Sequence, residues 1–217
     1  MNYRAKMLDR QVTIAAFAVG ALLLTGCAGQ PAGEQPAAGD GAAAPAQTSS
    51  PPSDAPTPAV PDLEDPSSWV IDYAAIGPVA LDSPVSDQAA SLASFTSATQ
   101  DACPSVAAFD KADFPSIWLP DPTGAGIVDQ IVLQAWGTVA AATAHSPQTR
   151  EAIGIGATLD QLTAAYPDLS ESAGKYAPVY SVTDDDAHWI NFALSDEGLV
   201  DTIVVRGTAA IDSEYCG

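Results

Sequence analysis

The stretches GIVDQIVL at residues 126–133 and GLVDTIVV at residues 198–205 share one pattern: a glycine, an acid three residues later, and then aliphatic residues. Farther upstream, IGPV at residues 76–79 and IGIG at residues 153–156 each precede the expected start of a helix. The order of elements is therefore the same twice, with an offset of 72 positions between the two stretches. We predict two copies of one supersecondary unit.

A helix is expected near the start of each unit. In the second unit, Thr158 and Gln161 have the spacing of a capping box, and Pro167 ends the helical pattern. In the first unit, Ser83 is a suitable N-cap, and Pro84 at the first helical position loses no hydrogen bond. The apolar stripes of the two helices are Val85, Ala89, Leu92 and Phe95, and then Leu159, Leu162 and Tyr166.

After each helix the period of the apolar residues changes from that of a helix to that of a strand. The predicted strands are residues 106–109, 116–119 and 127–136 in the first unit, and 176–182, 188–194 and 199–206 in the second. A helix followed by an antiparallel meander predicts an α+β fold, with the helices packed on one face of the sheet. The two units span about residues 74–136 and 150–206.

These elements resemble those of two bacterial families. The segment IGIGATLD at residues 153–160, Tyr166 with the following proline, and GLVDTI at residues 198–203 resemble the SmpA/OmlA-type small lipoproteins and the secreted β-lactamase inhibitor protein. The resemblance covers about residues 74–206, and the first unit departs from it where Asp82 begins the sequence DSP. It implies tandem α/β units, whereas inhibition of an enzyme does not follow from a shared fold.

Strand alternation predicts which side chains leave the helix-covered face of the sheet. The inward set is Ile117, Leu119, Ile131, Leu133, Ile190, Phe192, Leu194, Ile203 and Val205. The candidate binding face on the other side consists of Trp118, Trp136, Trp189, Gln134, Asn191 and Arg206. An exposed patch with tryptophan and arginine is typical of a binding surface. The alternative is that the two units, or residues 137–150, fold over this face and bury the rings.

The N-terminus has the layout of an export signal. A basic segment precedes an apolar run at residues 12–24, which is shorter than the roughly 20 apolar residues of a spanning helix. The sequence LTGC at residues 24–27 then resembles the lipobox of bacterial lipoproteins. The resemblance implies that residues 1–26 are a signal peptide and that Cys27 carries lipid, including palmitate, on the extracytoplasmic side of the cell membrane. The alternatives are an ordinary signal peptide and an uncleaved anchor.

A tether is expected between the lipid and the folded part of the chain. Residues 27–66 are rich in Ala, Pro, Gly and Ser and contain half of the chain's 18 prolines. Such a segment buries too little apolar surface to offset the entropy of ordering, so we predict that it is disordered. The globular α+β domain then occupies residues 67–217.

Charge and cysteine content agree with export. Without residues 1–26 the chain keeps 4 basic and 26 acidic residues, a formal net charge of −22, which disfavours nucleic acid as a partner. Once Cys27 is assigned to lipid, Cys103 and Cys216 remain, and we predict a disulfide between them. Two free thiols are the alternative.

The sequence contains no recognisable catalytic set. His145 and His188 are far apart and lack metal-ligand spacing, and residues 184–186 (DDD) lack the pattern of a calcium loop. Residues 153–156 lack the third glycine of a dinucleotide fingerprint. We therefore predict no cofactor, no metal site and no catalytic residue. The expected function is a non-catalytic binding or scaffold module for an envelope or extracellular protein, and the alternatives are an enzyme inhibitor and a cell-envelope hydrolase.

Overall fold

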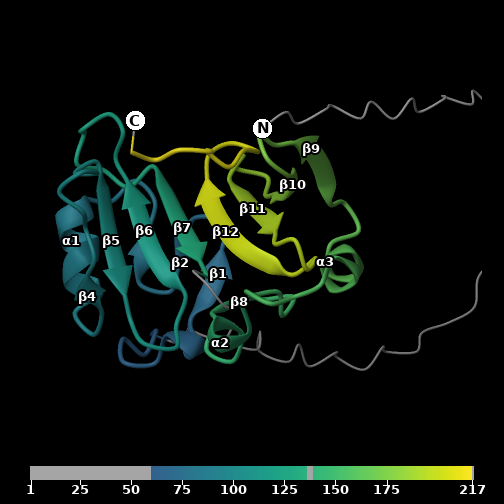
Figure 1. The fold of residues 1–217 in the computed structure, drawn as a ribbon, viewed down its shortest axis with the longest axis horizontal. Helices are drawn as coiled ribbons and strands as arrows, with labels where there is room; N and C mark the ends of the chain where they lie inside the picture. Colours follow the sequence, from purple (N-terminus) through teal and green to yellow (C-terminus); the bar gives the residue numbers. More distant parts are fainter. Residues whose placement is uncertain (1–59, 136–138, 217) are drawn as a thin grey trace, which may run out of the picture. The chain divides into compact units, whose positions relative to one another are not determined.

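An eight-stranded antiparallel sheet runs through the folded unit (Figure 1). The computed structural model describes residues 60–135 and 139–216, which lie within the compact unit Ala55–Gly217. The strands of the large sheet, in spatial order, are β4 (Thr96–Ser97), β5 (Val106–Asp110), β6 (Ser116–Pro120), β7 (Gln130–Gln134), β12 (Val200–Arg206), β11 (Trp189–Leu194), β10 (Pro178–Thr183) and β9 (Ser170–Ala173).

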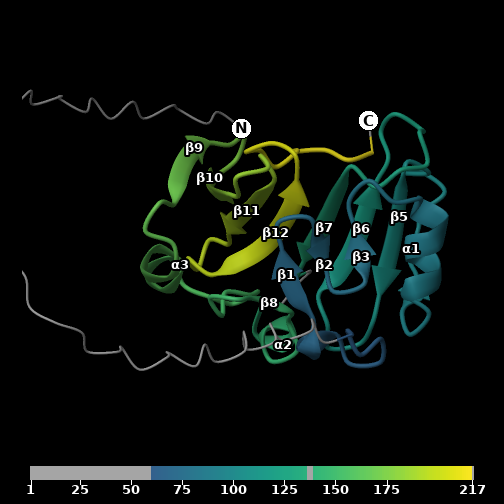
Figure 2. The same ribbon diagram turned by 180° about the vertical axis from the view of Figure 1, so that it is seen from behind.

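A smaller four-stranded sheet lies against one face of the large one. Its order is β3 (Val79–Ala80), β2 (Ala75–Ile76), β1 (Val70–Asp72) and β8 (Gln148–Thr149), and β1 pairs with β8 in parallel. Figure 2 shows β1, β2 and β3 in front of β6 and β7 when the molecule is seen from behind. The helices are α1 (Val85–Ser91), α2 (Val139–Thr143), α3 (Leu159–Ala165) and a 3₁₀ turn, η1 (Pro66–Ser68).

The large sheet consists of two similar halves that meet at β7 and β12. Each half is a four-stranded meander in chain order, β4 to β7 and β9 to β12. At the junction Val132 pairs with Val204, while Ile131 pairs with Val205 and Leu133 with Ile203. If one position pairs with a second across the junction, the residues that correspond to them 72 positions away also pair with each other, as a local two-fold arrangement requires.

The connections into the two helices also correspond. The backbone N–H of Asp82 donates to the carbonyl oxygen of Val128 (2.8 Å), and that of Gly156 donates to the carbonyl oxygen of Val200 (2.7 Å). Asp82 and Gly156 both have left-handed backbone, with φ of 58° and 89°. A Cβ at Gly156 would collide with the side chain of Thr143, so glycine is required there for space as well as for conformation.

The predicted fold class is wrong. The part of the chain that the structure describes is mostly β, because the three α-helices within it have only seven, five and seven residues. We predicted that helices cover one face of the large sheet, but the small sheet covers most of that face instead. Its Ile71, Ile76 and Val79 belong to the same core cluster as Ile117 and Leu119 of β6. The strands of this small sheet are two or three residues long, too short for a periodic signal in the sequence.

The core face of the large sheet follows the predicted alternation. Eight of the nine residues predicted to point inward are buried: Ile117, Leu119, Ile131, Leu133, Ile190, Phe192, Ile203 and Val205. The ninth, Leu194, packs against this core while remaining partly exposed. The six predicted strands are confirmed as β5, β6, β7, β10, β11 and β12. Their ends differ from the predicted positions by up to three residues, and the predicted end of β7 at residue 136 lies outside the described residues.

The two helix starts give different outcomes. The capping box at α3 is confirmed: Thr158 Oγ1 accepts from the Gln161 N–H (3.2 Å), and Gln161 Oε1 accepts from the Thr158 N–H (2.8 Å). At α1 the predicted N-cap is wrong by one position, because Pro84 is the N-cap and has no capping side chain. The Ser83 hydroxyl instead donates to the Leu81 carbonyl oxygen (3.3 Å).

Residues at the end of the predicted tether bond to the folded unit. Carbonyl oxygens of residues 62–64 accept hydrogen bonds from the Trp69 indole (2.6 Å), the Ser94 hydroxyl (2.9 Å) and the Lys111 ammonium group (2.8 Å). The folded unit therefore includes the chain from residue 62 onward. Cys27 and the rest of the predicted signal and tether lie outside the described residues.

Candidate functional site

The candidate binding face is the outer face of the large sheet, opposite the small sheet. One cross-strand row on this face runs through Ala108, Trp118, Val132, Val204 and Asn191. Since neighbouring strands alternate in the same register, every member of this row points away from the core. The row therefore places Trp118 and Asn191 of the candidate binding face on one side of the sheet, and the chemistry of the row changes from one end to the other.

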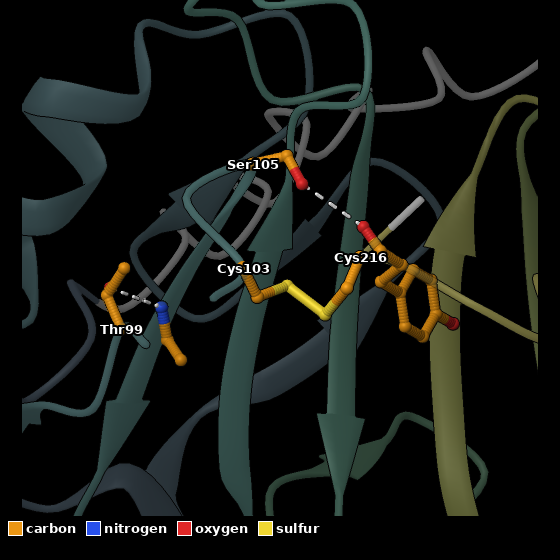
Figure 3. The surroundings of a disulfide bond; sticks show 6 residues. Thr99, Cys103, Ser105 and Cys216 are labelled. Carbon is orange, nitrogen blue, oxygen red and sulfur yellow. Dashed lines mark hydrogen bonds between the residues drawn. A yellow bond between two sulfur atoms is a disulfide. The ribbon is translucent and has the colours of Figure 1, made fainter. Parts of the chain in front are cut away.

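A C-terminal segment crosses this face. We call residues 207–216 the C-terminal strap; it leaves β12 and runs past β7 and β6 toward β5 (Figure 1). At its far end Cys216 is joined to Cys103 in a disulfide, the pair predicted from the cysteine count (Figure 3). Close to this disulfide the Ser105 hydroxyl donates to the Tyr215 carbonyl oxygen (3.3 Å), and the Tyr215 ring meets that of Trp118 edge-on, with centroids 6.1 Å apart.

Polar side chains hold the middle of the strap. Asp212 Oδ2 lies 2.9 Å from Arg206 Nη1 and accepts a hydrogen bond from Gln130 Nε2 (3.1 Å). Nearer β12, Asn191 Nδ2 donates to the carbonyl oxygen of Thr208 (3.1 Å). The strap therefore covers part of the face. The sequence pointed to the two units and residues 137–150 as segments that could cover it, but not to this C-terminal segment.

An apolar cavity of about 400 Å³ opens beside the strap, over β5 and β6. It is lined by Ala98, Gln100, Cys103, Val106, Ala108, Asp110, Ser116, Trp118 and Cys216. We call it the disulfide cavity, because both half-cystines form part of its wall. Its volume lies within the range of about 300–1,000 Å³ that is typical of ligand sites.

The disulfide cavity is apolar in its floor and acidic at its rim. Val106 and Ala108 are buried and form a small cluster with Cys103, against which Trp118 packs. At the rim Asp110 is exposed, and the Ser116 hydroxyl donates to its Oδ1 (2.5 Å). An apolar side chain fits the floor, and a cationic group fits the rim.

A smaller cavity of about 150 Å³ lies on the other side of the strap. It is lined by Ser105, Pro120, Pro122, Gln130, Asp212, Glu214 and Tyr215. Gln130 is only 1% exposed, and within the described residues its Oε1 and the Tyr215 hydroxyl have no hydrogen-bond partner. Burial, reinforced by the Asp212 charge, raises the pKa of Tyr215 to about 12, so this hydroxyl stays protonated.

The structure separates the other predicted members of the face. Trp189 is half-buried and lines a different cavity of about 240 Å³, together with Tyr73 and Tyr166. Gln134 is half-buried at the end of β7. Trp136 lies outside the described residues.

Asn191 belongs to the interior of the molecule. It has no exposed surface, and its Oδ1 accepts from the Ser181 hydroxyl (2.7 Å) while its Nδ2 donates to the carbonyl oxygens of Val204 (3.2 Å) and Thr208 (3.1 Å). These bonds give the buried amide its hydrogen-bond partners, and without them its burial would cost free energy. Asn191 is therefore a structural residue that fixes the start of the strap.

The basic residues downstream of Cys27 are all engaged in the structure. Arg150 pairs with Asp72, Lys175 with Glu214, and Arg206 with Asp212. The fourth, Lys111, bonds to a backbone carbonyl and lies over the rings of Phe95 and Phe114. Because these few cations are committed to internal partners, the long-range field of the folded unit is negative and attracts cationic partners.

One further cavity bears on the hydrolase alternative. It has a volume of about 630 Å³ and is bordered by Asp196, Glu197 and Asp201. Burial raises the pKa of Asp201, and the nearby Asp196 charge adds to this effect. The hydrolase alternative calls for a pair of acids with raised pKa values, and Asp201 supplies one.

Over residues 60–135 and 139–216, no three His, Cys, Asp or Glu side chains are grouped so that they could hold a metal ion. The helices described in this part of the chain are too short or too polar to cross a membrane. No family model, curated protein or solved structure matches this chain. The resemblance to small envelope lipoproteins and to the β-lactamase inhibitor protein therefore depends on the quoted residues alone.

Proposed function

We propose that the chain is a lipoprotein anchored through Cys27 to the extracytoplasmic side of the cell membrane, and that its folded unit is a non-catalytic binding module. The disulfide cavity is the observation that carries the binding role. It combines an apolar floor at Ala108 and Trp118 with an acidic rim at Asp110. The lipobox and the Pro-rich segment after it support the anchor and the tether.

The chemistry of the cavity specifies the kind of partner. Burial of one leucine- or phenylalanine-sized side chain in the floor contributes about 1.5–3 kcal/mol. A lysine or arginine beside that side chain would meet Asp110 at the rim, and the negative field of the folded unit favours the approach of such a segment. The partner is therefore an envelope or extracellular protein that presents an apolar side chain next to a basic one.

The binding role is tested by photocrosslinking in the native cell envelope. A photoreactive amino acid at Ser116, on the rim of the cavity, should give a discrete adduct. The same group at Ser172, on β9 in the other half of the sheet, is the matched control. Ala108→Leu fills the floor of the cavity and should abolish the Ser116 adduct. Identical adducts at both positions, or an adduct that persists in Ala108→Leu, would contradict the proposal.

The anchor is tested separately. Metabolic labelling with an alkynyl fatty acid should label the wild-type protein and leave Cys27→Ser unlabelled. The variant should also move from the membrane fraction to the soluble fraction, since removal of the acyl chains removes the membrane affinity that they supply. Labelling that survives the Cys27→Ser substitution would refute the anchor without affecting the binding role.

A further inference from the structure

The C-terminal strap separates the two cavities of the outer face. Cys216 lines the disulfide cavity, while Asp212, Glu214 and Tyr215 line the smaller cavity of about 150 Å³. The two cavities therefore meet at the last five residues of the strap, where the disulfide joins Cys216 to Cys103 (Figure 3). Displacement of those five residues would leave one continuous depression over β5, β6 and β7.

The noncovalent hold on this end of the strap is incomplete. Its contacts are the ion pairs of Asp212 with Arg206 and of Glu214 with Lys175, the second between exposed side chains, together with one hydrogen bond from Gln130, one from Ser105, and the edge-on ring contact of Tyr215. At the same time the closed strap leaves the Gln130 Oε1 and the Tyr215 hydroxyl buried without a partner among the described residues. Unpaired buried polar atoms oppose closure. The disulfide is therefore the contact that decides whether this end stays in place.

The disulfide is open to attack from one side. Cys216 is exposed, whereas Cys103 is 6% exposed. A thiolate can reach the Cys216 sulfur, form a mixed disulfide there and release the Cys103 thiolate. The second thiol of a dithiol then attacks the mixed disulfide and frees Cys216. The dithiol is oxidised to its own disulfide, and its two electrons and two protons reduce the pair to two thiols.

The geometry points to a redox-gated binding site: reduction of Cys103–Cys216 by a dithiol releases residues 212–216 and joins the two cavities into one open groove. In the oxidised protein the site admits a single apolar side chain, and in the reduced protein it admits a longer segment. The claim that the reduced protein binds a longer segment rests on the proposed function. The claim that the strap moves on reduction does not, so each claim has its own test.

Hydrogen exchange of the full mature chain, oxidised and after treatment with dithiothreitol, tests the movement. Exchange of the amides in residues 207–216 should accelerate on reduction and approach the rate of an open chain, while the amides of β7 and β12 remain much better protected than the strap, although the lost stability of the whole unit speeds their exchange as well. Cys216→Ser should reproduce this result without reductant. Strap amides that stay as well protected as those of β7 and β12 in the reduced protein would overturn the gate, and so would complete loss of protection across β7 and β12, which signals unfolding.

Binding of the neutral dye Nile red tests the groove. Its fluorescence should rise several-fold on reduction and in Cys216→Ser. Asp212→Asn, which weakens the ion pair with Arg206, should increase the signal further in the reduced state only. Asp72→Asn is the matched control, because it weakens the ion pair with Arg150 in the small sheet and leaves the strap untouched. Equal dye binding in both redox states would overturn the proposal, whatever the outcome of the crosslinking at Ser116.

Discussion

Trp118 in β6 and Asn191 in β11 occupy equivalent positions in the two halves of the large sheet. Each pairs with the valine of its own half that lies at the junction between the halves, Val132 for Trp118 and Val204 for Asn191. Trp118 is half-buried beside an apolar cavity, whereas Asn191 is completely buried in a network of hydrogen bonds. The two halves therefore share one backbone topology, but the outer face is apolar in the first half and polar in the second.

The next position along the row shows the same contrast. Ala108 of the first half forms the floor of the disulfide cavity, and the equivalent residue of the second half, Ser181, donates to Asn191. On the core face the halves stay alike, because both are filled by aliphatic and aromatic side chains. The comparison indicates that the core face preserves the fold, while the outer faces diverged into a cavity and a polar support for the strap.

The disulfide gives the largest expected effect, because it links the two halves covalently. Cys103 and Cys216 are separated by 113 residues, and closure of a loop of that length stabilises the folded state by about 4–5 kcal/mol in the chain-entropy model. We expect Cys216→Ser to lower the free energy of unfolding by this amount in denaturant titrations followed by circular dichroism. Reduction of the wild type should give the same loss. A loss below about 1 kcal/mol would show that the halves hold together without the link.

The core faces should respond equally to the same substitution. Ile131 in β7 and Ile203 in β12 are equivalent, and neither has exposed surface. Replacement of a buried isoleucine by alanine costs about 2–5 kcal/mol. We expect Ile131→Ala and Ile203→Ala to fall within about 1 kcal/mol of each other when measured by urea unfolding. A larger difference would mean that the two halves are packed to different extents.

The helix starts should respond unequally. Thr158 caps α3 in a reciprocal capping box, and its replacement by alanine should cost about 1 kcal/mol. At α1 the N-cap is Pro84, and the neighbouring Ser83 does not cap the helix, so Ser83→Ala should cost less than about 0.5 kcal/mol. Chemical unfolding of both variants checks the pair. Equal losses would contradict the difference between the two helix starts.

The sequence predicted those parts of the fold that depend on local pattern. The alternation of Ile117 and Leu119, or of Ile190 and Phe192, is long enough to identify a strand and its buried face. The capping box at Thr158 is equally local. The small sheet could not be predicted in this way, because β1 pairs with β8 across more than 70 residues of chain and its strands are too short to alternate.

The candidate site was predicted only in part. Alternation placed Trp118 and Asn191 on one face, but no periodic signal marks the strap that covers part of it. A signal did exist in the cysteine pair. If Cys216 must reach Cys103, just before β5, then the chain after β12 has to cross β7 and β6. Strand order and disulfide together would have predicted a covered face.

The loops that lead into β7 and β12 provide the finest test of the comparison. In the first half, Asp121 accepts hydrogen bonds from the backbone N–H groups of Gly126 (2.7 Å) and Ala125 (2.9 Å), and these bonds, the Gly126 bond above all, lower the pKa of its carboxyl group. In the second half, the hydroxyl of Ser195, which does not titrate, accepts from the Glu197 N–H (3.3 Å). The first loop should therefore be sensitive to acid, and the second should not.

The sign follows from linkage. Because the pKa of Asp121 is lower in the folded state than in the unfolded chain, its contribution to stability is fully present above the unfolded value and is lost as the pH falls through the folded value. An NMR titration of the Asp121 carboxyl carbon should give a midpoint below about 3.9. Asp121→Asn should remove the acid-dependent shifts of the Gly126 amide, while Ser195→Ala leaves them unchanged. A midpoint at or above the ordinary aspartate value would show that the two loops are held in the same way.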